Sequence, residues 1–570
     1  MAPTDIDESS PVRVLADEYW EAVLRASPTY ATFLGDRRFD TEIEDVSAEA
    51  EAEQRARWSE LLERVTELDL DAAPLDQRVT RDLLVESLSD AIAHIDHRIS
   101  ELRYDQMGGL VAELLTDAPQ INAPEPQNAL DLVERQRKVG ALFDGAIARF
   151  RAGLEAGRTP PRIVVERALH QVDGYLASPL DTDPFAAFAG PEDWDGEERW
   201  RTALRTVAGD VVRPAFARYA AVLRDELLPR ARGDDEAGLR HQAGGDELYR
   251  VLIRSNTGLD LDPAEVHQIG VDEVAALDEQ IVALGRQMFG VRTLPEVFER
   301  LRTDPELRYD PSRPEAPLDD ARRCVAAATE VMAGWFGRLP VSVCEVKAVP
   351  EMLGADGPGA YYFPPAADGS RPGTYFVNTH DAGERNRFDT ASTAFHEAIP
   401  GHHLQLAIAS ELDDLPAFQR FSLGHTAYVE GWALYSERLA DEMGLYASDV
   451  DRLGMLVGDA FRACRLVVDT GMHALGWTRQ QAIDHMTAHL PMGVDEITTE
   501  VDRYLAIPGQ ALAYKIGQRE ILRLRAWATA ELGDRFDLPG FHDAVLGSSS
   551  VSLPVLGAIV ADWVDTRRAA

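Results

Sequence analysis

One apolar segment interrupts its own helix and carries three histidines and a glutamate. It runs from Thr393 to Gln405 and reads TAFHEAIPGHHLQ. A helix here must break at Pro400, because proline lacks the backbone donor that a helix interior needs, and Gly401 gives the chain free backbone angles to recover. Histidine nitrogens and carboxylate oxygens are the ligands of catalytic zinc, which takes three from protein and keeps one position open. The segment therefore indicates a chain built from helices around a metal ion.

The proline stands where a regular metal helix has its second histidine. In the His-Glu-x-x-His helix the two histidines are one turn apart and the glutamate acts as base. In an unbroken helix His402 would lie about 240° around from His396, whereas His403 would share its face about 10 Å further along. We expect the break to turn His402 back, so that His396 and His402 are ligands. His403 would then support a ligand or contact substrate, and the choice between His402 and His403 stays open here.

The third ligand is expected on a second helix, over 429–439. Glu430 and Glu437 are seven residues apart on one face of it. Glu430 is predicted to bind the metal, and Glu437 to orient a ligating histidine. Glu397 would take a proton from water and pass it to the leaving amine. The alternative, a solvated polar surface, fits poorly with the apolar residues around the histidines, since buried ionisable groups need partners.

The residues around these motifs resemble a known family. The matching stretches are HEAIPGHHLQ (396–405), EGWALYSERLADEMGLY (430–446) and, as support, 249–277, 465–478 and 503–525. Over most of its length the chain resembles the bacterial family called domain of unknown function 885 (DUF885). That family is similar in fold to the helical carboxypeptidase Taq metallopeptidases and, more distantly, to thimet-type oligopeptidases. The resemblance implies zinc ligands His396 and Glu430 with Glu397 as base, and the chain departs from these relatives by the residues inserted before His402.

A small sheet is expected just before the metal helix. Between 340 and 378, short alternating and aromatic stretches are separated by Pro, Gly and Asp turns, which predicts an antiparallel sheet. An extended peptide can add to the edge of such a sheet as one more strand. Tyr361 and Tyr362 are therefore candidate substrate contacts, and packing within the sheet is an equal alternative for each of them.

A later helix is expected to carry a polar stripe. Arg462, Arg465, Asp469 and His473 follow one another at spacings of three, four and four. Arg465 could contact substrate and His473 could stabilise a tetrahedral oxyanion. The alternative is a buried arginine–aspartate brace.

The C-terminal segment 503–515 offers further candidates. The resemblance to thimet-type enzymes implies that Tyr504 or Tyr514 donates to the oxyanion. Arg503 or Lys515 could receive the C-terminal carboxylate of a peptide, as a carboxypeptidase requires.

Composition narrows the partners and the location. The chain has 97 acidic against 57 basic residues, a net charge of −40, so nucleic acid and anionic membrane surfaces are poor partners. Three scattered cysteines give neither a disulfide framework nor a thiolate metal site. The sequence shows no basic leader followed by an apolar run and no stretch of about 18 apolar residues, so we expect a cytoplasmic protein.

Helical periodicity dominates the rest of the 570 residues, most clearly over 11–37, 77–103 and 127–156. A polar, Gly-rich connection at 229–246 predicts a boundary. We expect residues 1–240 to form an N-terminal helical half that covers the cleft. Residues 241–570 would form a catalytic half that contains the sheet (340–378), the metal helices (390–440) and the C-terminal helices.

The sequence thus predicts a mainly α, helical metallopeptidase-like fold with a deep cleft and a small antiparallel sheet before the metal-binding helix. We expect a zinc-dependent peptide hydrolase, a carboxypeptidase or oligopeptidase that acts on short peptides. Another zinc amide or ester hydrolase is one alternative, and a catalytically inactive binding protein on a peptidase scaffold is another. A homodimer is compatible with the sequence.

Overall fold

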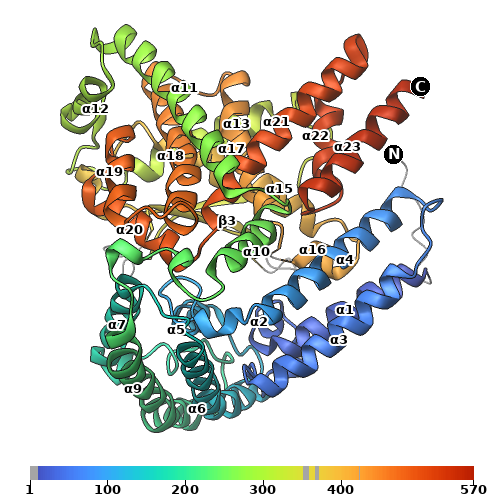
Figure 1. The fold of residues 1–570 in the computed structure, drawn as a ribbon, viewed down its shortest axis with the longest axis vertical. Helices are drawn as coiled ribbons and strands as arrows, with labels where there is room; N and C mark the ends of the chain where they lie inside the picture. Colours follow the sequence, from blue (N-terminus) through green and yellow to red (C-terminus); the bar gives the residue numbers. More distant parts are fainter. Residues whose placement is uncertain (1–9, 351–357, 366–370, 423, 570) are drawn as a thin grey trace.

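The computed structural model describes residues 10–350, 358–365, 371–422 and 424–569, and its regular structure is mostly helical (Figure 1). The N-terminal helices are α1 (Pro11–Ala26), α2 (Pro28–Phe33), α3 (Ala48–Thr66), α4 (Leu75–Asp96), α5 (Leu110–Asp117), α6 (Pro126–Glu155), α7 (Arg162–Ala177), α8 (Glu197–Val207) and α9 (Arg213–Val222). They are followed by α10 (Gly245–Thr257), α11 (Pro263–Phe289), α12 (Leu294–Thr303), α13 (Ala316–Val331), α14 (Thr390–Glu397), α15 (His402–Ser410), α16 (Ala417–Phe421) and α17 (Thr426–Glu442). The last are α18 (Asp449–His473), α19 (Arg479–His489), α20 (Val494–Ala506), α21 (Ala513–Leu532), α22 (Leu538–Leu546) and α23 (Leu553–Ala569). The predicted mainly α class is confirmed.

Three predicted helices exist, but two of them end early. The helix predicted over 127–156 is α6, correct to within one residue. The one predicted over 11–37 ends at Ala26, and Pro28 begins the separate helix α2, because proline fits the first turn of a helix and not its interior. The one predicted over 77–103 ends at Asp96, just before Arg98 adopts a left-handed backbone conformation. Apolar periodicity marks the buried face of a helix, whereas local backbone geometry sets its end.

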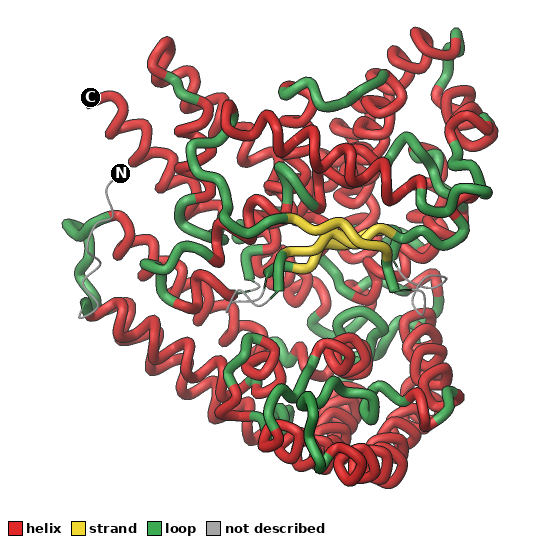
Figure 2. The backbone as a smooth tube through the Cα atoms, turned by 180° about the vertical axis from the view of Figure 1, so that it is seen from behind, coloured by secondary structure: helices red, strands yellow, loops and turns green. Residues whose placement is uncertain are grey.

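The sheet has three strands, β1 (Cys344–Ala348), β2 (Ala360–Phe363) and β3 (Gly373–Val377), and it is mixed. The order is β1-β3-β2, with β3 parallel to β1 and antiparallel to β2. The prediction of an antiparallel sheet was therefore wrong. The chain reverses between β1 and β2 and again between β2 and β3, and β3 then fits between the other two, so that it runs in the direction of β1. Figure 2 shows the strands near the middle of the molecule.

The predicted halves occupy opposite ends of the molecule. Helices α1 to α9 gather at one end in Figure 1, and the helices from α11 onward fill the other. One continuous cluster of buried apolar side chains nevertheless extends from Val12 to Val564. The N-terminal and C-terminal parts of the chain contact each other where α4 packs on α23 and where α7 contacts α20. The domain boundary and the deep cleft stay predictions. Among the described residues, no helix is both long enough and apolar enough to cross a membrane.

Candidate metal centre

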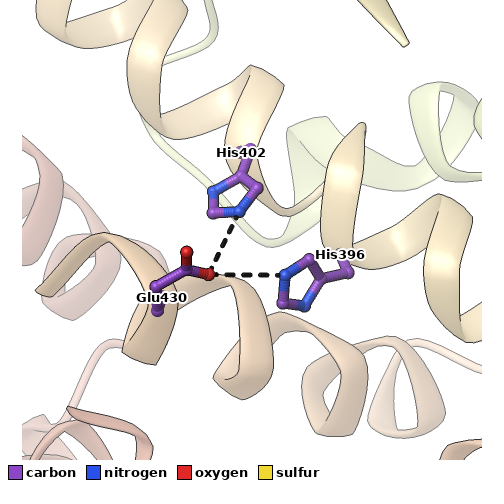
Figure 3. A group of neighbouring side chains, drawn as sticks. All are labelled: His396, His402 and Glu430. Atoms are coloured by element: carbon purple, nitrogen blue, oxygen red, sulfur yellow. Dashed lines mark ion pairs between the residues drawn. The ribbon is translucent and has the colours of Figure 1, made fainter. Parts of the chain in front are cut away.

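His396, His402 and Glu430 converge from three helices on one point (Figure 3). Glu430 Oε2 lies 3.6 Å from His396 Nε2 and 3.5 Å from His402 Nε2, and the three ligand atoms all lie within 4.8 Å of one another. A tetrahedral zinc with bonds of about 2.1 Å keeps its ligand atoms roughly 3.4 Å apart. His396 and His402 are 4% and 9% exposed, and Glu430 Oε2 is buried without a hydrogen-bond partner among the described residues. The group fits a metal ion.

The proline–glycine break is what brings His402 to His396. Helix α14 ends at Glu397 and α15 begins at His402, so the two histidines sit on different helices. Gly401 is needed at the break, because a Cβ there would lie 1.9 Å from the carbonyl oxygen of His396. Helix α17 holds the break in place, since the Trp432 indole N–H donates to the carbonyl of Pro400 at 2.9 Å. The predicted return of His402 toward His396 is what the structure shows.

His403 points away from this group. Its Nδ1 lies 2.9 Å from the hydroxyl of Tyr362, and its Nε2 lies 3.1 Å from the carbonyl oxygen of Ser342. Since a carbonyl only accepts, Nε2 donates to Ser342 and Nδ1 accepts from Tyr362. Burial lowers the pKa of His403 to about 4, so the ring stays neutral. Gly373 makes room for the pair, because a Cβ there would lie 2.2 Å from the Tyr362 hydroxyl.

Glu437 contacts His396, the residue that it was predicted to orient. Its Oε1 lies 2.8 Å from His396 Nδ1, which leaves Nε2 directed at Glu430. Arg462 Nη2 lies 3.5 Å from the same carboxylate oxygen. A ligating histidine whose other nitrogen binds a carboxylate has a fixed orientation and a more basic ring. Glu437 on α17 and Arg462 on α18 thus form a second layer of contacts behind His396.

The charges of the centre are strongly coupled. Burial alone would lower the pKa of His396, but its interactions with the carboxylates of Glu430 and Glu437 outweigh burial and raise the pKa to about 9. Burial would likewise raise the pKa of Glu430, yet the nearby rings of His396 and His402 hold it well below its ordinary value. Glu430 is therefore an anion at neutral pH, the form that binds a cation.

Glu397, the predicted base, is the last residue of α14 and follows His396 directly. It is half-buried, and within the described part of the chain its carboxylate forms no hydrogen bond or ion pair. It lies close enough to His396 to favour the charged ring electrostatically. A free carboxylate beside the metal ligands is what a general base requires.

Tyr514 and Arg465 lie next to the candidate metal ligands. The Tyr514 ring stacks on His396 with ring centroids 6.4 Å apart. The Arg465 guanidinium lies over the Tyr514 ring, with its carbon 4.4 Å from the ring centroid. Arg465 donates to the Tyr504 hydroxyl at 3.0 Å and to Glu500 at 3.1 Å. Arg503 also donates to Glu500, at 3.3 Å. The predicted residues Tyr504, Tyr514, Arg465 and Arg503 are thus one cluster beside the centre.

Two predicted site residues have other tasks. His473 Nδ1 accepts from the backbone N–H of Leu239 at 3.1 Å, and its Nε2 donates to the carbonyl of Tyr504 at 3.0 Å. Both nitrogens are occupied, so the ring has no donor left for an oxyanion. Lys515 is buried and binds Asp459 at 2.7 Å, Gln518 at 2.9 Å and Glu273 at 3.2 Å, so its three N–H groups are used.

The tyrosines of β2 divide between the two faces of the strand. Tyr362 binds His403, as described above. Tyr361 stacks on Phe376 of β3, with centroids 4.9 Å apart and rings 20° from parallel. Both contacts are packing contacts within the sheet and its neighbouring helix, and a role for either tyrosine in substrate binding stays a prediction.

Sequence reasoning missed the residues that hold the ligands in place. Trp432 binds Pro400, and the Ser436 hydroxyl lies 3.0 Å from the carbonyl of Phe395 in α14. Glu500, which joins Arg465 to Arg503, was missed as well. Trp432 and Ser436 lie two and six residues after Glu430, but only their partners, which are distant in the sequence, give them a role.

The fold and the centre define a class of protein, mainly helical, with a buried His-His-Glu group of metal-ligand spacing carried by a broken helix. The chain belongs to the family described as bacterial protein of unknown function (DUF885), whose model matches residues 28–560. The resemblance to that family is confirmed, while the likeness to carboxypeptidase Taq and thimet-type enzymes stays a prediction.

Two solved structures share the fold over almost the whole chain. A "putative lipoprotein" from Colwellia psychrerythraea is 29% identical with a TM-score of 0.90, and the match covers 98% of this chain and 100% of that one. A "putative lipoprotein of unknown function" from Shewanella oneidensis is 18% identical with a TM-score of 0.76, covering 97% and 100%. No curated protein matches the chain.

Proposed function

We propose that the chain is a zinc-dependent hydrolase of short peptides. The observation that carries this proposal is the convergence of His396 Nε2, His402 Nε2 and Glu430 Oε2 beside the free carboxylate of Glu397. Structural zinc sites are closed by four protein ligands, whereas catalytic sites use three and leave one position for reactants. The described residues supply three, which favours a catalytic site.

The residues around the group can perform hydrolysis. A zinc ion held there would supply Lewis acidity toward water and a substrate carbonyl. Glu397 takes a proton from the attacking water and passes it to the leaving amine. The Tyr514 phenol, whose pKa burial raises, stays protonated and can donate a hydrogen bond to the oxyanion of the tetrahedral intermediate. His473, which was the other candidate for this task, is already fully bonded.

A peptide substrate is favoured by the sheet. In the order β1-β3-β2, strand β2 is an edge, and it contacts α14, the helix that carries His396. An extended peptide can pair with such an edge through its backbone. The same chemistry would hydrolyse another amide or an ester, which is the second candidate.

Location is a separate question. The cytoplasmic location expected from the sequence stays a prediction. If this chain shares what the descriptions of the two solved relatives say of those proteins, it works at the cell envelope instead. Fractionation of producing cells, followed by detection of the protein in each fraction, distinguishes the two locations.

Zinc content and turnover test the proposal together. The wild type should hold about one zinc per chain, and His396→Ala should hold little. The matched variant His485→Ala, which changes a half-buried histidine of α19 outside the group, should keep the ion. Glu397→Gln should keep zinc and lower the turnover of short peptides by roughly 10²–10⁴-fold. Unchanged turnover in Glu397→Gln would show that Glu397 is not the general base. A wild type that binds no zinc would contradict the hydrolase and favour the alternative of a catalytically inactive binding protein.

A further inference from the structure

Two guanidiniums, those of buried Arg465 and half-buried Arg503, lie beside the candidate metal ligands, and within the described residues the only carboxylate that binds either of them is Glu500. Arg465, Arg503 and Tyr504 all donate to the same atom, Glu500 Oε2, at 3.1, 3.3 and 2.7 Å. Two cations therefore share one anion. The region is almost closed to solvent, since Arg465 is 5% exposed and Tyr504 is fully buried. Buried charges are normally paired, so this excess positive charge favours an anionic ligand.

Arg465 still has hydrogen-bond donors to offer. Its Nε binds Tyr504 and its Nη2 binds Glu500, but Nη1 is buried with no hydrogen-bond partner among the described residues. The guanidinium is held between two aromatic rings, with its carbon 4.2 Å from the Phe461 centroid and 4.4 Å from the Tyr514 centroid. A fixed guanidinium with a free edge is suited to bind a carboxylate through parallel hydrogen bonds.

The group is close to the centre and open on one side. The Arg465 guanidinium carbon lies 4.4 Å from the centroid of the Tyr514 ring, and that centroid lies 6.4 Å from the centroid of the His396 ring. The guanidinium carbon is therefore within about 11 Å of the His396 ring. Extended peptide spans about 3.5 Å per residue. The side chains of Glu500 and Arg503, 23% and 15% exposed, form the edge that solvent reaches.

We propose that Arg465, assisted by Arg503, binds the free C-terminal carboxylate of a peptide whose cleaved bond lies one or two residues earlier. This inference rests on the proposed function and narrows it from short peptides in general to release of C-terminal residues. It also replaces Lys515, whose donors are used, with Arg465 as the carboxylate-binding residue.

Equilibrium binding tests the inference without turnover. Zinc-loaded Glu397→Gln protein is titrated in a calorimeter with N-acetylated di- and tripeptides of several C-terminal residues. Each is compared with its C-terminal amide at constant ionic strength. The acids should bind roughly tenfold or more tightly than the amides, since a hydrogen bond to a charged group is worth more than one to a neutral group. Because this comparison needs no change at Arg465, it does not depend on how a variant folds.

Variants then assign the effect to one residue. Arg465→Lys keeps the charge and loses the planar arrangement of donors. The variant should bind the peptide acids about tenfold more weakly and the amides with unchanged affinity. Arg525→Lys is the matched control, because Arg525 also pairs with a carboxylate, Glu442, and lies over a tyrosine ring, yet it is three turns along α21 from Tyr514. It should change neither affinity.

The outcomes separate the inference from the proposed function. Equal affinity for the peptide acids and their amides would overturn the carboxylate site, and so would an Arg465→Lys variant that binds both forms equally more weakly. Either result would leave the proposed peptide hydrolase untouched. If zinc is bound but no peptide binds in either form, the peptide substrate fails and this inference fails with it.

Discussion

The indole N–H of Trp432 donates a 2.9 Å hydrogen bond to the carbonyl of Pro400, and this bond joins the helix of one candidate metal ligand to the break that positions another. Glu430 lies two residues before Trp432, and His402 lies two residues after Pro400. Both partners are buried, so the bond is protected from competition by water. The relative position of Glu430 and His402 is therefore fixed by a contact between α17 and the break that separates α14 from α15.

Trp432→Phe should keep most of the packing and lose this bond. A buried carbonyl left without its partner costs about 1–3 kcal/mol of unfolding free energy. Zinc affinity should fall about tenfold, because residues that orient ligands typically contribute tenfold or more. Urea unfolding and competition with a chromophoric zinc chelator measure the two effects. Trp200→Phe is the control, since Trp200 is equally buried but its indole N–H has no hydrogen-bond partner among the described residues. Equal zinc affinity in the two variants would contradict the role of Trp432.

Glu437→Gln tests the carboxylate that orients His396. The amide keeps the size of the side chain but removes the negative charge 2.8 Å from His396 Nδ1. Zinc affinity should fall by roughly 10–100-fold. Glu442→Gln, at an exposed position of the same helix whose carboxylate pairs with half-buried Arg525, should leave the affinity unchanged. A Glu437→Gln protein that binds zinc as tightly as the wild type would show that His396 needs no support.

His402 and His403 should respond differently to the same substitution. His402→Gln removes a ligand and should reduce zinc to well below one per chain. His403→Gln should keep about one zinc but lower the unfolding free energy by about 1–3 kcal/mol, because Tyr362 and Ser342 lose a buried partner. Metal analysis and urea unfolding of both variants decide the assignment, which fails if His403→Gln is the one that loses zinc.

His473 should make stability depend on pH. Burial lowers its pKa from 6.5 to about 3, so the unfolded chain binds a proton between those values that the folded chain does not bind. The stability from this histidine is full above pH 6.5 and is lost as the pH falls through that window. Between pH 7.5 and 5.5 the loss is about 1.4 kcal/mol.

His473→Gln should remove that part of the pH dependence, since an amide can make both hydrogen bonds without titrating. The measurement is the free energy of unfolding in urea at the two pH values. The exposed histidine His241, changed to Gln, should leave the difference as in the wild type. A His473→Gln protein with the pH dependence of the wild type would show that His473 is not buried as a neutral ring.

The local part of the centre could be predicted from the sequence. The helical spacing of Glu430 and Glu437, the proline that excludes a ligand at position 400 and the apolar neighbours of His396 are properties of short segments. They led to the same three residues that the structure brings together as a group able to hold a metal ion. The roles of His473 and Lys515 could not be predicted in this way, because their partners, Leu239, Glu273 and Asp459 among them, come from other helices.

Residue patterns alone were enough to predict the helical class, the family and the set of residues able to bind a metal, because periodicity and the effect of proline act over a few residues. The tertiary structure decided that His402 and not His403 faces Glu430, because Tyr362 and Ser342, 41 and 61 residues away, occupy both nitrogens of His403. It also decided the parallel pairing of β1 with β3 and the position of Arg465 beside Tyr514. Hydrogen bonds and ring contacts depend on which segments meet in space, and that depends on the packing of the whole chain.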